Sequence, residues 1–543
     1  MRNFILLPLL CLSVFATAQT LKDTVARLDS FFAAHSVGDS TPGGVLMISR
    51  NGQILYKKYM GLASLEHKTP ITENTVFEAA SVSKQFTATS ILLLAREGRI
   101  SLDDDVRKYI PQLPDYGETI RIHHLLTHTS GLKDWRNITY ISGWPTGKRL
   151  YNQSMALDMI CKQKSLNFMP GERYSYSNSG YDLLAVIVEK VSGMKFKDFV
   201  GERLLKLAGM NQSFFRPAHE QIIPHMASSY IQQNDQSYIH PLILDESYGA
   251  AGLITNATDL HKWVLFIEKG GLSEDIKKLR STRFVLNNGD TITYALGGVH
   301  VMHRDNLIEI NHSGLLAGFR AWTAYYPQSG LTVSYTSNNR NVITADMAKV
   351  IRNIFFGTNE VLGSNSPNVK QDTSYLKSIS ALYRGVTDNS WWIDVQYRNG
   401  VILHGNDTLK PISPAIFTNG TYRYKFEDGY LNLITAETDD KYKRAERFHP
   451  DQQHLASFEG EYYSDDADLA FSIKLIGDRL YSYRTSYDSV PLVPVYSDAE
   501  MTGFRTIHNG LRAVYHFEKD KDGSVIRLSV SLPRANNIPF RKN

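Results

Sequence analysis

The chain has 543 residues, of which 42% are hydrophobic and 21% are charged. Because a single domain usually stays below about 250 residues, this length predicts two or three domains, and the balanced composition excludes a largely disordered chain. The formal net charge is only +4, and the sequence contains no dense run of lysine and arginine. We therefore expect no nucleic-acid partner.

The first eighteen residues have the three parts of a secretory signal. Arg2 is followed by an apolar stretch from Phe4 to Phe15 and then by the small residues of Ala16-Thr17-Ala18, which predicts cleavage after Ala18. The apolar stretch is shorter than the ~20 residues of a membrane-spanning helix, so a membrane anchor is the less favoured alternative. We expect an exported protein, periplasmic or secreted, without a transmembrane segment in the mature chain.

The two cysteines bear on lipid attachment and on disulfides. Cys11 follows Leu10, which is bulky where a lipid-attachment site needs a small residue, so a lipoprotein is disfavoured. Cleavage of the signal leaves Cys161 as the one cysteine of the mature chain, which therefore cannot form an intramolecular disulfide. The fold must be held together by packing.

The first predicted elements are a helix and a hairpin. Apolar residues from Leu21 to Phe32 recur at helical spacing, which favours a short amphipathic helix. The stretches Val45–Ser49 and Ile54–Tyr59 have the composition of strands. The pair Asn51-Gly52 between them readily adopts the positive φ of a tight turn. An antiparallel sheet is therefore expected to begin close to the amino terminus.

Further elements predict helices around this sheet. The apolar segments Phe86–Gly98 and Tyr181–Val191 each end near a glycine and are expected to be core helices. Phe319–Tyr326 and Leu331–Ser337 form a second predicted hairpin, which is followed by a helical pattern from Val342 to Phe356. This part of the chain predicts an α+β fold, in which helices flank an antiparallel sheet.

The composition changes near residue 360. Residues 361–372 are rich in Gly, Asn and Ser and are predicted to be a linker, and short alternating strands follow it. The segment Tyr383–Phe417 weakly resembles Phe458–Phe504. We therefore expect an α+β domain at 19–360 after the signal at 1–18, and two small barrel-like β modules at 373–452 and 453–543; a single larger β domain is the alternative.

The pattern Ser-x-x-Lys carries the strongest chemical signal. A serine hydroxyl needs an adjacent base to act as a nucleophile, and residues three apart share one face of a helix. The pattern occurs at Ser81/Lys84, Ser130/Lys133, Ser192/Lys195 and Ser374/Lys377. Of these serines, only Ser81 opens a long apolar helix, which singles out Ser81 and Lys84.

Two further short motifs follow in the chain, Tyr176-Ser-Asn178 directly before a predicted helix and His312-Ser-Gly314 on a predicted strand. Alone, neither is informative, because similar triplets recur elsewhere. The order of four segments is specific, and it closely resembles the serine β-lactamase-related hydrolases of the class C type. That family includes penicillin-binding carboxypeptidases, D-aminopeptidases and esterases. The segments are Glu78–Thr87, Leu125–Leu132, Pro170–Tyr181 and His312–Arg320, and the resemblance covers roughly residues 20–356.

The resemblance implies a helical region above the sheet, a site in the groove between them, and a role for each motif. Ser81 attacks a carbonyl to form an acyl-enzyme, while Lys84 and Tyr176 share the proton transfers. Asn178 holds the substrate amide and orients Lys84. The backbone N–H groups of Ser81 and Leu315, beside Gly314, form the oxyanion hole.

His312 departs from the lysine that β-lactamases and carboxypeptidases usually carry at this position. Histidine is mostly neutral at pH 7, so it attracts a substrate carboxylate less strongly than a lysine would, unless Arg320 compensates. We expect a serine hydrolase that cleaves a small ester or amide, such as a D-amino-acid peptide, with a cell-wall peptide as one option. A β-lactamase or D-alanyl-D-alanine carboxypeptidase is the alternative, and a catalytically silent penicillin-binding sensor is an alternative of another class.

Other residue clusters favour packing over binding. The histidines lack recognised zinc spacings, so we expect neither a metal nor a cofactor; they are His123, His124, His128, His300 and His303. Trp391-Trp392 is expected to lie in a β core. The stretch Trp135–Lys164 has no assigned element and is expected to contribute to the rim of the groove, where specificity lies.

Overall fold

The computed structural model describes residues 23–543 apart from 36, 142–148, 217, 235–236, 243, 305, 359–370, 387–390, 420–421, 435–438, 486–487, 499–500 and 509–510. The expected signal sequence at 1–18 and most of the expected linker at 361–372 therefore lie outside the described residues. Among the described residues, no helix combines the length and the apolar character needed to cross a membrane.

An eight-stranded antiparallel sheet forms the centre of the first part of the chain, with the order β12-β13-β14-β15-β16-β17-β1-β2. The predicted amino-terminal hairpin is its edge, with Asn51 and Gly52 at φ 52° and 88°. The pairing of β1 with β17 joins this hairpin to strands from much later in the chain. The bounds are β1 Gly44–Arg50, β2 Gln53–Met60, β12 Arg283–Val285, β13 Thr291–Ala295, β14 Val299–Arg304, β15 Leu307–Leu316, β16 Phe319–Tyr326 and β17 Leu331–Ser337.

Helices cover both faces of this sheet. On one face, the helix over residues 23–34 and α10 (Thr344–Phe355) pack on Ile48 and Val333. On the other face, α8 (Ala257–Glu268) contacts the alternate strand positions through His261. Because both faces are covered, β17 is buried along its whole length, as expected for a sheet between two helical layers.

A helical region shares its apolar core with one side of the sheet. Its two long helices begin at the predicted motifs, α2 (Lys84–Arg96) just after Ser81 and α6 (Asn178–Ser192) just after Tyr176; α6 ends at Gly193, whose φ of 75° closes the helix. The others are α3 Ile122–Leu126, α4 Trp135–Ile141, α5 Gln153–Lys162, α7 Phe196–Val200, α9 Glu274–Arg280, the π-helical turn Gly201–Leu205 and the 3-10 turns η1 Ala80–Ser83 and η2 Val106–Lys108.

Short strands connect these helices to the sheet. They are β3 Leu62–Ser64, β4 Thr69–Pro70, β5 Phe77–Glu78, β6 Tyr151–Asn152, β7 Phe214–Phe215, β8 Ile231–Asn234, β9 Ser237–Ile239, β10 Asp245–Glu246 and β11 Leu253–Thr255. One of them, β5, leads directly into the turn that carries Ser81, and β11 pairs with it. The predicted α+β architecture is confirmed.

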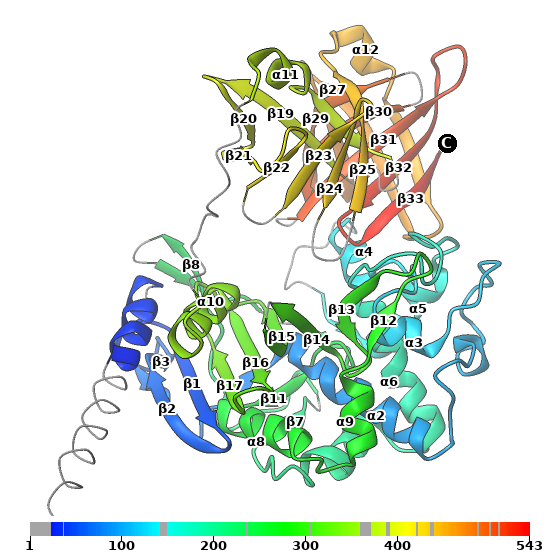
Figure 1. The fold of residues 1–543 in the computed structure, drawn as a ribbon. Coiled ribbons are helices and arrows are strands. Elements are labelled where there is room, and N and C mark those ends of the chain that lie inside the picture. The colour runs from blue at the N-terminus through cyan, green and yellow to red at the C-terminus, as the bar shows by residue number, and fades with distance from the viewer. Residues whose placement is uncertain are drawn as a thin grey trace, which may run out of the picture.

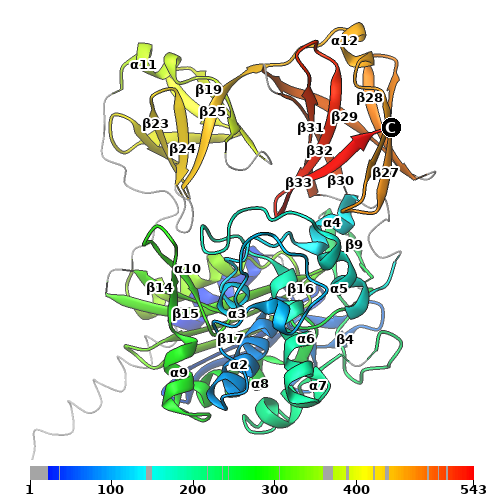
Figure 2. The ribbon, with the colours of Figure 1, turned by 90° about the vertical axis from the view of Figure 1, so that its right-hand side faces the viewer.

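Two closed antiparallel barrels form the rest of the chain. The first runs from β18 to β25 and closes by the pairing of β18 with β25; in the second, which holds β26 to β33, the pairing of β29 with β30 closes the ring. Each barrel has its own apolar core. The two are joined where β25 pairs with β29, and Figure 2 shows them side by side. The predicted pair of all-β modules is confirmed.

Some barrel strands alternate in burial as the sequence predicts, such as β23, whereas β31 and β32 contain runs of five buried residues. In the first barrel they are β18 Leu382–Gly385, β19 Trp392–Arg398, β20 Val401–His404, β21 Asp407–Pro411, β22 Ile416–Thr418, β23 Arg423–Glu427, β24 Tyr430–Ile434 and β25 Asp439–Arg447. In the second they are β26 Gly460–Ser464, β27 Leu469–Ile476, β28 Arg479–Thr485, β29 Asp488–Ser497, β30 Met501–His508, β31 Leu511–Lys519, β32 Val525–Leu532 and β33 Ala535–Lys542. Short helices precede them, α11 Thr373–Ser378 and α12 Gln452–Ala456.

The second barrel is docked on the helical region. Ile138 and Ile141 of α4 belong to the apolar core of that barrel, and Arg484 Nη1 donates to the Tyr140 carbonyl at 3.0 Å. After α5, Gln163 Nε2 donates to the Asp466 carbonyl at 2.7 Å. Both barrels lie on the same side of the sheet-containing part (Figure 1). Within the stretch Trp135–Lys164, unassigned from sequence, α4 and the residue that follows α5 therefore contact the second barrel.

Candidate active site

Ser81 lies in the 3-10 turn η1, directly before the buried helix α2. The preceding residue, Ala80, has a φ of 49°, a region that residues with a side chain rarely adopt and that costs about 1–3 kcal/mol. Such strain is retained when the surrounding structure holds the segment in place. Here the strained residue directly precedes the partly buried Ser81.

Lys84 is fully buried at the first position of α2. Its Nζ lies 3.4 Å from Ser81 Oγ, 2.9 Å from Asn178 Oδ1 and 2.9 Å from the Ala250 carbonyl oxygen. The structure therefore brings Ser81, Lys84 and Asn178 together around one amine.

The electrostatic surroundings favour a neutral amine. Burial lowers the Lys84 pKa well below its ordinary value, and the positive charge of Arg136 lowers it further, whereas the carboxylates of Asp182 and Asp134 raise it. The net effect makes the lysine a proton acceptor at a lower pH than a solvated lysine would be. This is what a base for the Ser81 hydroxyl requires.

Tyr176 completes the group. Its hydroxyl is buried and has no hydrogen-bond partner among the described residues, and its ring centre lies 4.7 Å from Lys84 Nζ. Burial raises the Tyr176 pKa, while the Ser81 side chain, which lies close to the Tyr176 hydroxyl without the geometry of a full hydrogen bond, and the charge of Arg534 lower it. A buried hydroxyl left without a partner is costly in a core, but it suits a group that transfers protons to a bound substrate.

His128 supports the segment that carries Tyr176. Its ring centre lies 4.2 Å from that of Tyr176, and its Nδ1 accepts a hydrogen bond from the Ser177 backbone N–H at 3.1 Å. Burial lowers the His128 pKa well below its ordinary value, with Lys84 as the next cause, so the ring is neutral. His128 has a packing role here, in agreement with the structural role expected from sequence.

Asp134 orients Asn178, and the sequence did not single it out. Its Oδ2 accepts hydrogen bonds from the Asn178 backbone N–H at 2.7 Å and from Asn178 Nδ2 at 2.9 Å. With Nδ2 held in this way, Asn178 Oδ1 faces Lys84. Asp134 comes just after the Leu125–Leu132 motif, and this position is the one sequence signal that could have identified it.

The third motif lies on β15, which runs against the Ser81 turn. A Cβ added to Gly314 would meet the Ala79 carbonyl oxygen at 2.2 Å and the Ser81 nitrogen at 3.1 Å, so only glycine allows this approach. Leu315, the next residue, has a 42% exposed side chain. The structure thus places Gly314 and Leu315 beside Ser81, while their part in an oxyanion hole stays a prediction.

His312 is buried on β15 and is not a cation. Its Nδ1 lies 2.7 Å from the Ser313 carbonyl oxygen, which can only accept, so Nδ1 carries the proton and Nε2 accepts from the Tyr294 hydroxyl at 3.0 Å. Burial lowers the His312 pKa well below its ordinary value, and His300 adds to this. Arg320, the expected compensating cation, donates instead to the Arg340 carbonyl oxygen.

The remaining histidines do not gather into a site. His123 Nδ1 lies 3.2 Å from Asp103, and His124 Nδ1 accepts from the Arg121 backbone N–H. His300 is partly buried beside Thr293, whereas His303 is exposed. Within the described ranges of the chain, no three His, Cys, Asp or Glu side chains are grouped as metal ligands.

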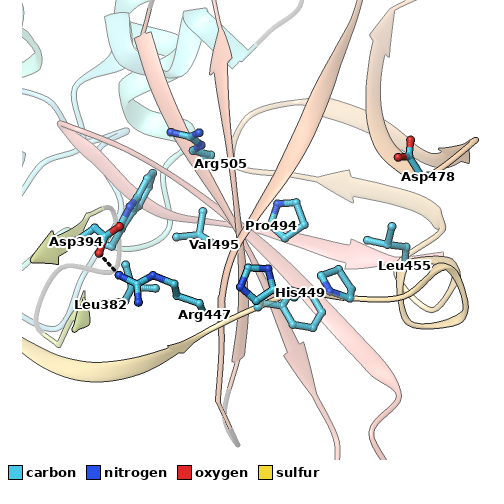
Figure 3. A pocket seen from close by; sticks show the side chains of 12 residues that line it. Leu382, Asp394, Arg447, His449, Leu455, Asp478, Pro494, Val495 and Arg505 are labelled. Atoms are coloured by element: carbon cyan, nitrogen blue, oxygen red, sulfur yellow. Dashed lines mark hydrogen bonds and ion pairs between the residues drawn. The ribbon is translucent and has the colours of Figure 1, made fainter. Parts of the chain in front are cut away.

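A cavity of about 480 Å³ lies at the junction of the two barrels (Figure 3). Trp392, Asp394, Arg447 and His449 are among its lining residues, and Asp394 and Arg447 form an ion pair across it. None of the lining residues belongs to the Ser81 group. Of the pair expected in a β core, Trp391 packs against the core of the first barrel, whereas Trp392 lines this cavity and is partly exposed.

One further residue reaches the site from the second barrel. Arg534 lies in the turn between β32 and β33, and its Cζ is 4.7 Å from the ring centre of Tyr176. No sequence motif pointed to Arg534. The site is therefore built from the sheet, the helical region and the second barrel together.

Comparisons with known proteins agree with this geometry. The family described as Beta-lactamase matches residues 28–354. A penicillin-binding protein of Bacillus subtilis (strain 168) is 32% identical, with the match covering 62% of this chain and 75% of that protein. A D-aminopeptidase of Gluconobacter oxydans (strain 621H) is 26% identical over 60% of this chain, but the chain covers only 61% of that enzyme's length.

Solved structures show the same fold. A penicillin-binding protein from Bacillus halodurans superposes with a TM-score of 0.53 at 26% identity and covers 60% of this chain and 99% of its own. An octameric penicillin-binding protein homologue from Pyrococcus abyssi, with a TM-score of 0.54 and 20% identity, covers 96% of this chain and 99% of its own, so it shares the fold of the carboxy-terminal part as well. The family match covers more than half of the chain and includes Ser81, Lys84, Tyr176 and His312. The chain belongs to the beta-lactamase family.

Proposed function

We propose that the protein, a serine hydrolase, cleaves a small ester or amide through an acyl-enzyme on Ser81, with a D-amino-acid peptide or ester as the favoured substrate class. The observation that carries this proposal is the Lys84 amine, which is buried, has a lowered pKa and lies 3.4 Å from Ser81 Oγ. A non-catalytic binding module has no need for such an arrangement, because a buried lysine of this kind destabilises the fold.

In the proposed reaction, Ser81 Oγ attacks the substrate carbonyl while its proton passes to Lys84. Tyr176, whose hydroxyl has no partner among the described residues, relays a proton to the leaving group as the bond to it breaks. The Ser81 and Leu315 backbone N–H groups stabilise the oxyanion, each by about 3 kcal/mol. Water then attacks the acyl group while the same residues take up its proton, and they pass a proton to Ser81 Oγ as the bond to the acyl group breaks.

The relatives support an ester or amide substrate but differ in what they act on. They include the D-aminopeptidase noted above and a hydrolase with promiscuous acyltransferase activity, EstCE1, which shares only the fold at 19% identity and a TM-score of 0.51. A neutral, buried His312 weighs against a β-lactamase, whose substrate carboxylate is normally met by a lysine at this position. We propose an exported location, on the basis of the first eighteen residues, and a short peptide of the cell wall as one substrate.

A fluorophosphonate probe tests the proposal, because it bonds covalently to an activated serine. Wild type should be labelled and Ser81→Ala should not. Ser374→Ala is the matched control, since Ser374 belongs to another Ser-x-x-Lys pattern on the exposed helix α11 and should label like wild type. Absence of Ser81-dependent labelling would contradict the proposed nucleophile and leave the silent-sensor alternative.

A substrate panel then ranks the chemistries. A p-nitrophenyl ester and D-alanyl peptides should be turned over faster than nitrocefin, because no cationic residue occupies the position of His312. Rapid nitrocefin hydrolysis would overturn the preference for esters and D-peptides.

A further inference from the structure

The turn that carries Arg534 is fixed to the hydrolase part by its backbone. The Arg534 carbonyl oxygen accepts from the Asp134 backbone N–H at 2.8 Å and from Asn167 Nδ2 at 3.2 Å, and the Arg534 N–H donates to Asn137 Oδ1 at 3.1 Å. Asn536 N donates to Asn167 Oδ1 at 2.8 Å. The turn is therefore held from both sides, which gives the arginine a defined place at the site.

The Arg534 side chain is oriented but not neutralised. Its guanidinium lies over the Tyr176 ring, within the range of a cation–π contact, and the residue is exposed. In the part of the chain that the structure describes, no carboxylate forms an ion pair with it. By contrast, the nearby Arg136 is paired with Asp245 at 2.6 Å.

A cation beside Tyr176 supplies the positive charge for an anionic substrate group, which the motif His312-Ser313-Gly314 does not supply. His312 is neutral, and Arg320 directs its Nε and Nη2 donors to the Arg340 carbonyl oxygen, so neither presents a cation with a free pair of donors to an anionic substrate group. A guanidinium presents parallel N–H donors that match the two oxygens of a carboxylate. Its contact with the Tyr176 ring leaves the edge of the guanidinium available for such a pairing.

We propose that Arg534 binds a free carboxylate of the substrate, so that the second barrel supplies a specificity-determining residue to the active site. This rests on the proposed function, since it concerns the substrate that Ser81 attacks. Asp134 links the two binding elements: its side chain holds Asn178, which would hold the substrate amide, and its backbone N–H holds the Arg534 turn. A substrate amide and carboxylate would thereby be bound at a fixed separation.

The test uses boronic acids, which bind an activated serine through a reversible bond from Oγ to boron, with the serine proton passing to the base. The probes are 3-carboxyphenylboronic acid and 4-carboxyphenylboronic acid, each paired with its neutral carboxamide. We expect wild type to bind at least one carboxylate probe about 10-fold or more tightly than Arg534→Gln does, the size of a charge-assisted hydrogen bond. The affinity for the carboxamide probes should fall at most a few-fold in Arg534→Gln.

Two further variants make the outcome specific. Arg527→Gln removes an exposed arginine from the same strand pair of the second barrel and should bind all probes like wild type. Arg534→Lys keeps the charge without the paired donors, so its affinity for the carboxylate probe should fall between those of wild type and Arg534→Gln. It also provides a folded comparison should the glutamine variant be unstable.

Equal losses on carboxylate and carboxamide probes, or no preference of wild type for a carboxylate, would overturn the role of Arg534 while Ser81 labelling by the fluorophosphonate persists. Absence of Ser81 labelling in wild type would instead overturn the proposed function, and the role of Arg534 with it. The two failures are therefore distinguishable.

Discussion

Asp134 holds Asn178 by two hydrogen bonds, from the backbone N–H at 2.7 Å and from the side-chain amide at 2.9 Å. An asparagine amide can otherwise rotate to exchange its oxygen and nitrogen. If it did so here, an NH₂ group would face the Lys84 amine, and the lysine would lose an acceptor. Asp134 is thus a positioning residue that acts through Asn178.

Replacement of Asp134 should slow the reaction more than it weakens substrate binding. In Asp134→Ala the Asn178 amide is no longer held, and kcat should fall by about 10- to 100-fold, as for loss of a buried hydrogen bond to a charged group. Asp134→Asn keeps one acceptor, so its kcat should fall less. Because the Asp134 charge raises the Lys84 pKa, the acidic limb of the pH profile should also move to lower pH in both variants. A loss of stability with an unmoved limb would show a merely structural role.

The pH dependence of wild type should follow Lys84. The amine accepts the Ser81 proton only when neutral, so kcat/KM should rise with pH through the Lys84 pKa. Because burial and Arg136 lower that pKa, the plateau should be reached well below about pH 10.4, the ordinary lysine value.

Arg534→Gln removes a positive charge that also lowers the Lys84 pKa, so the acidic limb of this variant should move to higher pH. Arg527→Gln is the control, and its acidic limb should lie where that of wild type does. A limb at the ordinary lysine pKa would contradict the assignment of Lys84 as the base.

Gly314→Ala should abolish most activity. Its Cβ would meet the Ala79 carbonyl oxygen at 2.2 Å, so β15 must move away from the Ser81 turn. Loss of the oxyanion geometry should lower kcat by about 100-fold or more, as measured on a p-nitrophenyl ester. Gly201→Ala is the matched control: it has an ordinary helical φ of −55° and open space around the added Cβ, so it should keep full activity and gain about 0.5–1 kcal/mol of stability. Near wild-type turnover in Gly314→Ala would show that the reaction does not require the close approach of β15 to the Ser81 turn.

Short sequence motifs predicted the site residues whose positions are set by local structure. Ser81 and Lys84 are three residues apart at the start of a buried helix, and Tyr176 lies two residues before Asn178, the first residue of another helix. The hairpin at Asn51-Gly52 and the alternating strands of the barrels were likewise predictable, because turn chemistry and the period of two are local properties. The fold class followed from these elements.

Asp134 and Arg534 could not be found in this way, because their roles arise from contacts between distant segments. Arg534 is one arginine in a β-turn, and its turn reaches Tyr176 only because the second barrel docks on α4. The strained φ of Ala80 is likewise imposed by the surrounding fold, since alanine has no local preference for it. Sequence patterns report which face of an element is buried, but not which other element covers it.

His261 should make the protein sensitive to acid. It connects α8 to the sheet, with Nε2 2.7 Å from Ser49 Oγ and Nδ1 3.0 Å from Ser334 Oγ, and it is only 2% exposed. Burial, with a smaller contribution from the charge of Lys57, lowers its pKa to about 4. An unfolded histidine has a pKa of about 6.5. Between these two values the unfolded state therefore binds the proton and the folded state does not.

Stability should consequently fall as the pH decreases from about 6.5 towards 4, by about 3 kcal/mol from this residue, since each pKa unit corresponds to about 1.4 kcal/mol. Thermal melts across this range should show a weaker pH dependence for His261→Gln, which retains polar atoms but cannot titrate. His303→Gln changes an exposed histidine of β14 and should melt with the wild-type dependence. If wild type and His261→Gln lost stability equally with acid, the proton would have to be taken up elsewhere in the fold, and the buried bridge between α8 and the sheet would not be the group responsible.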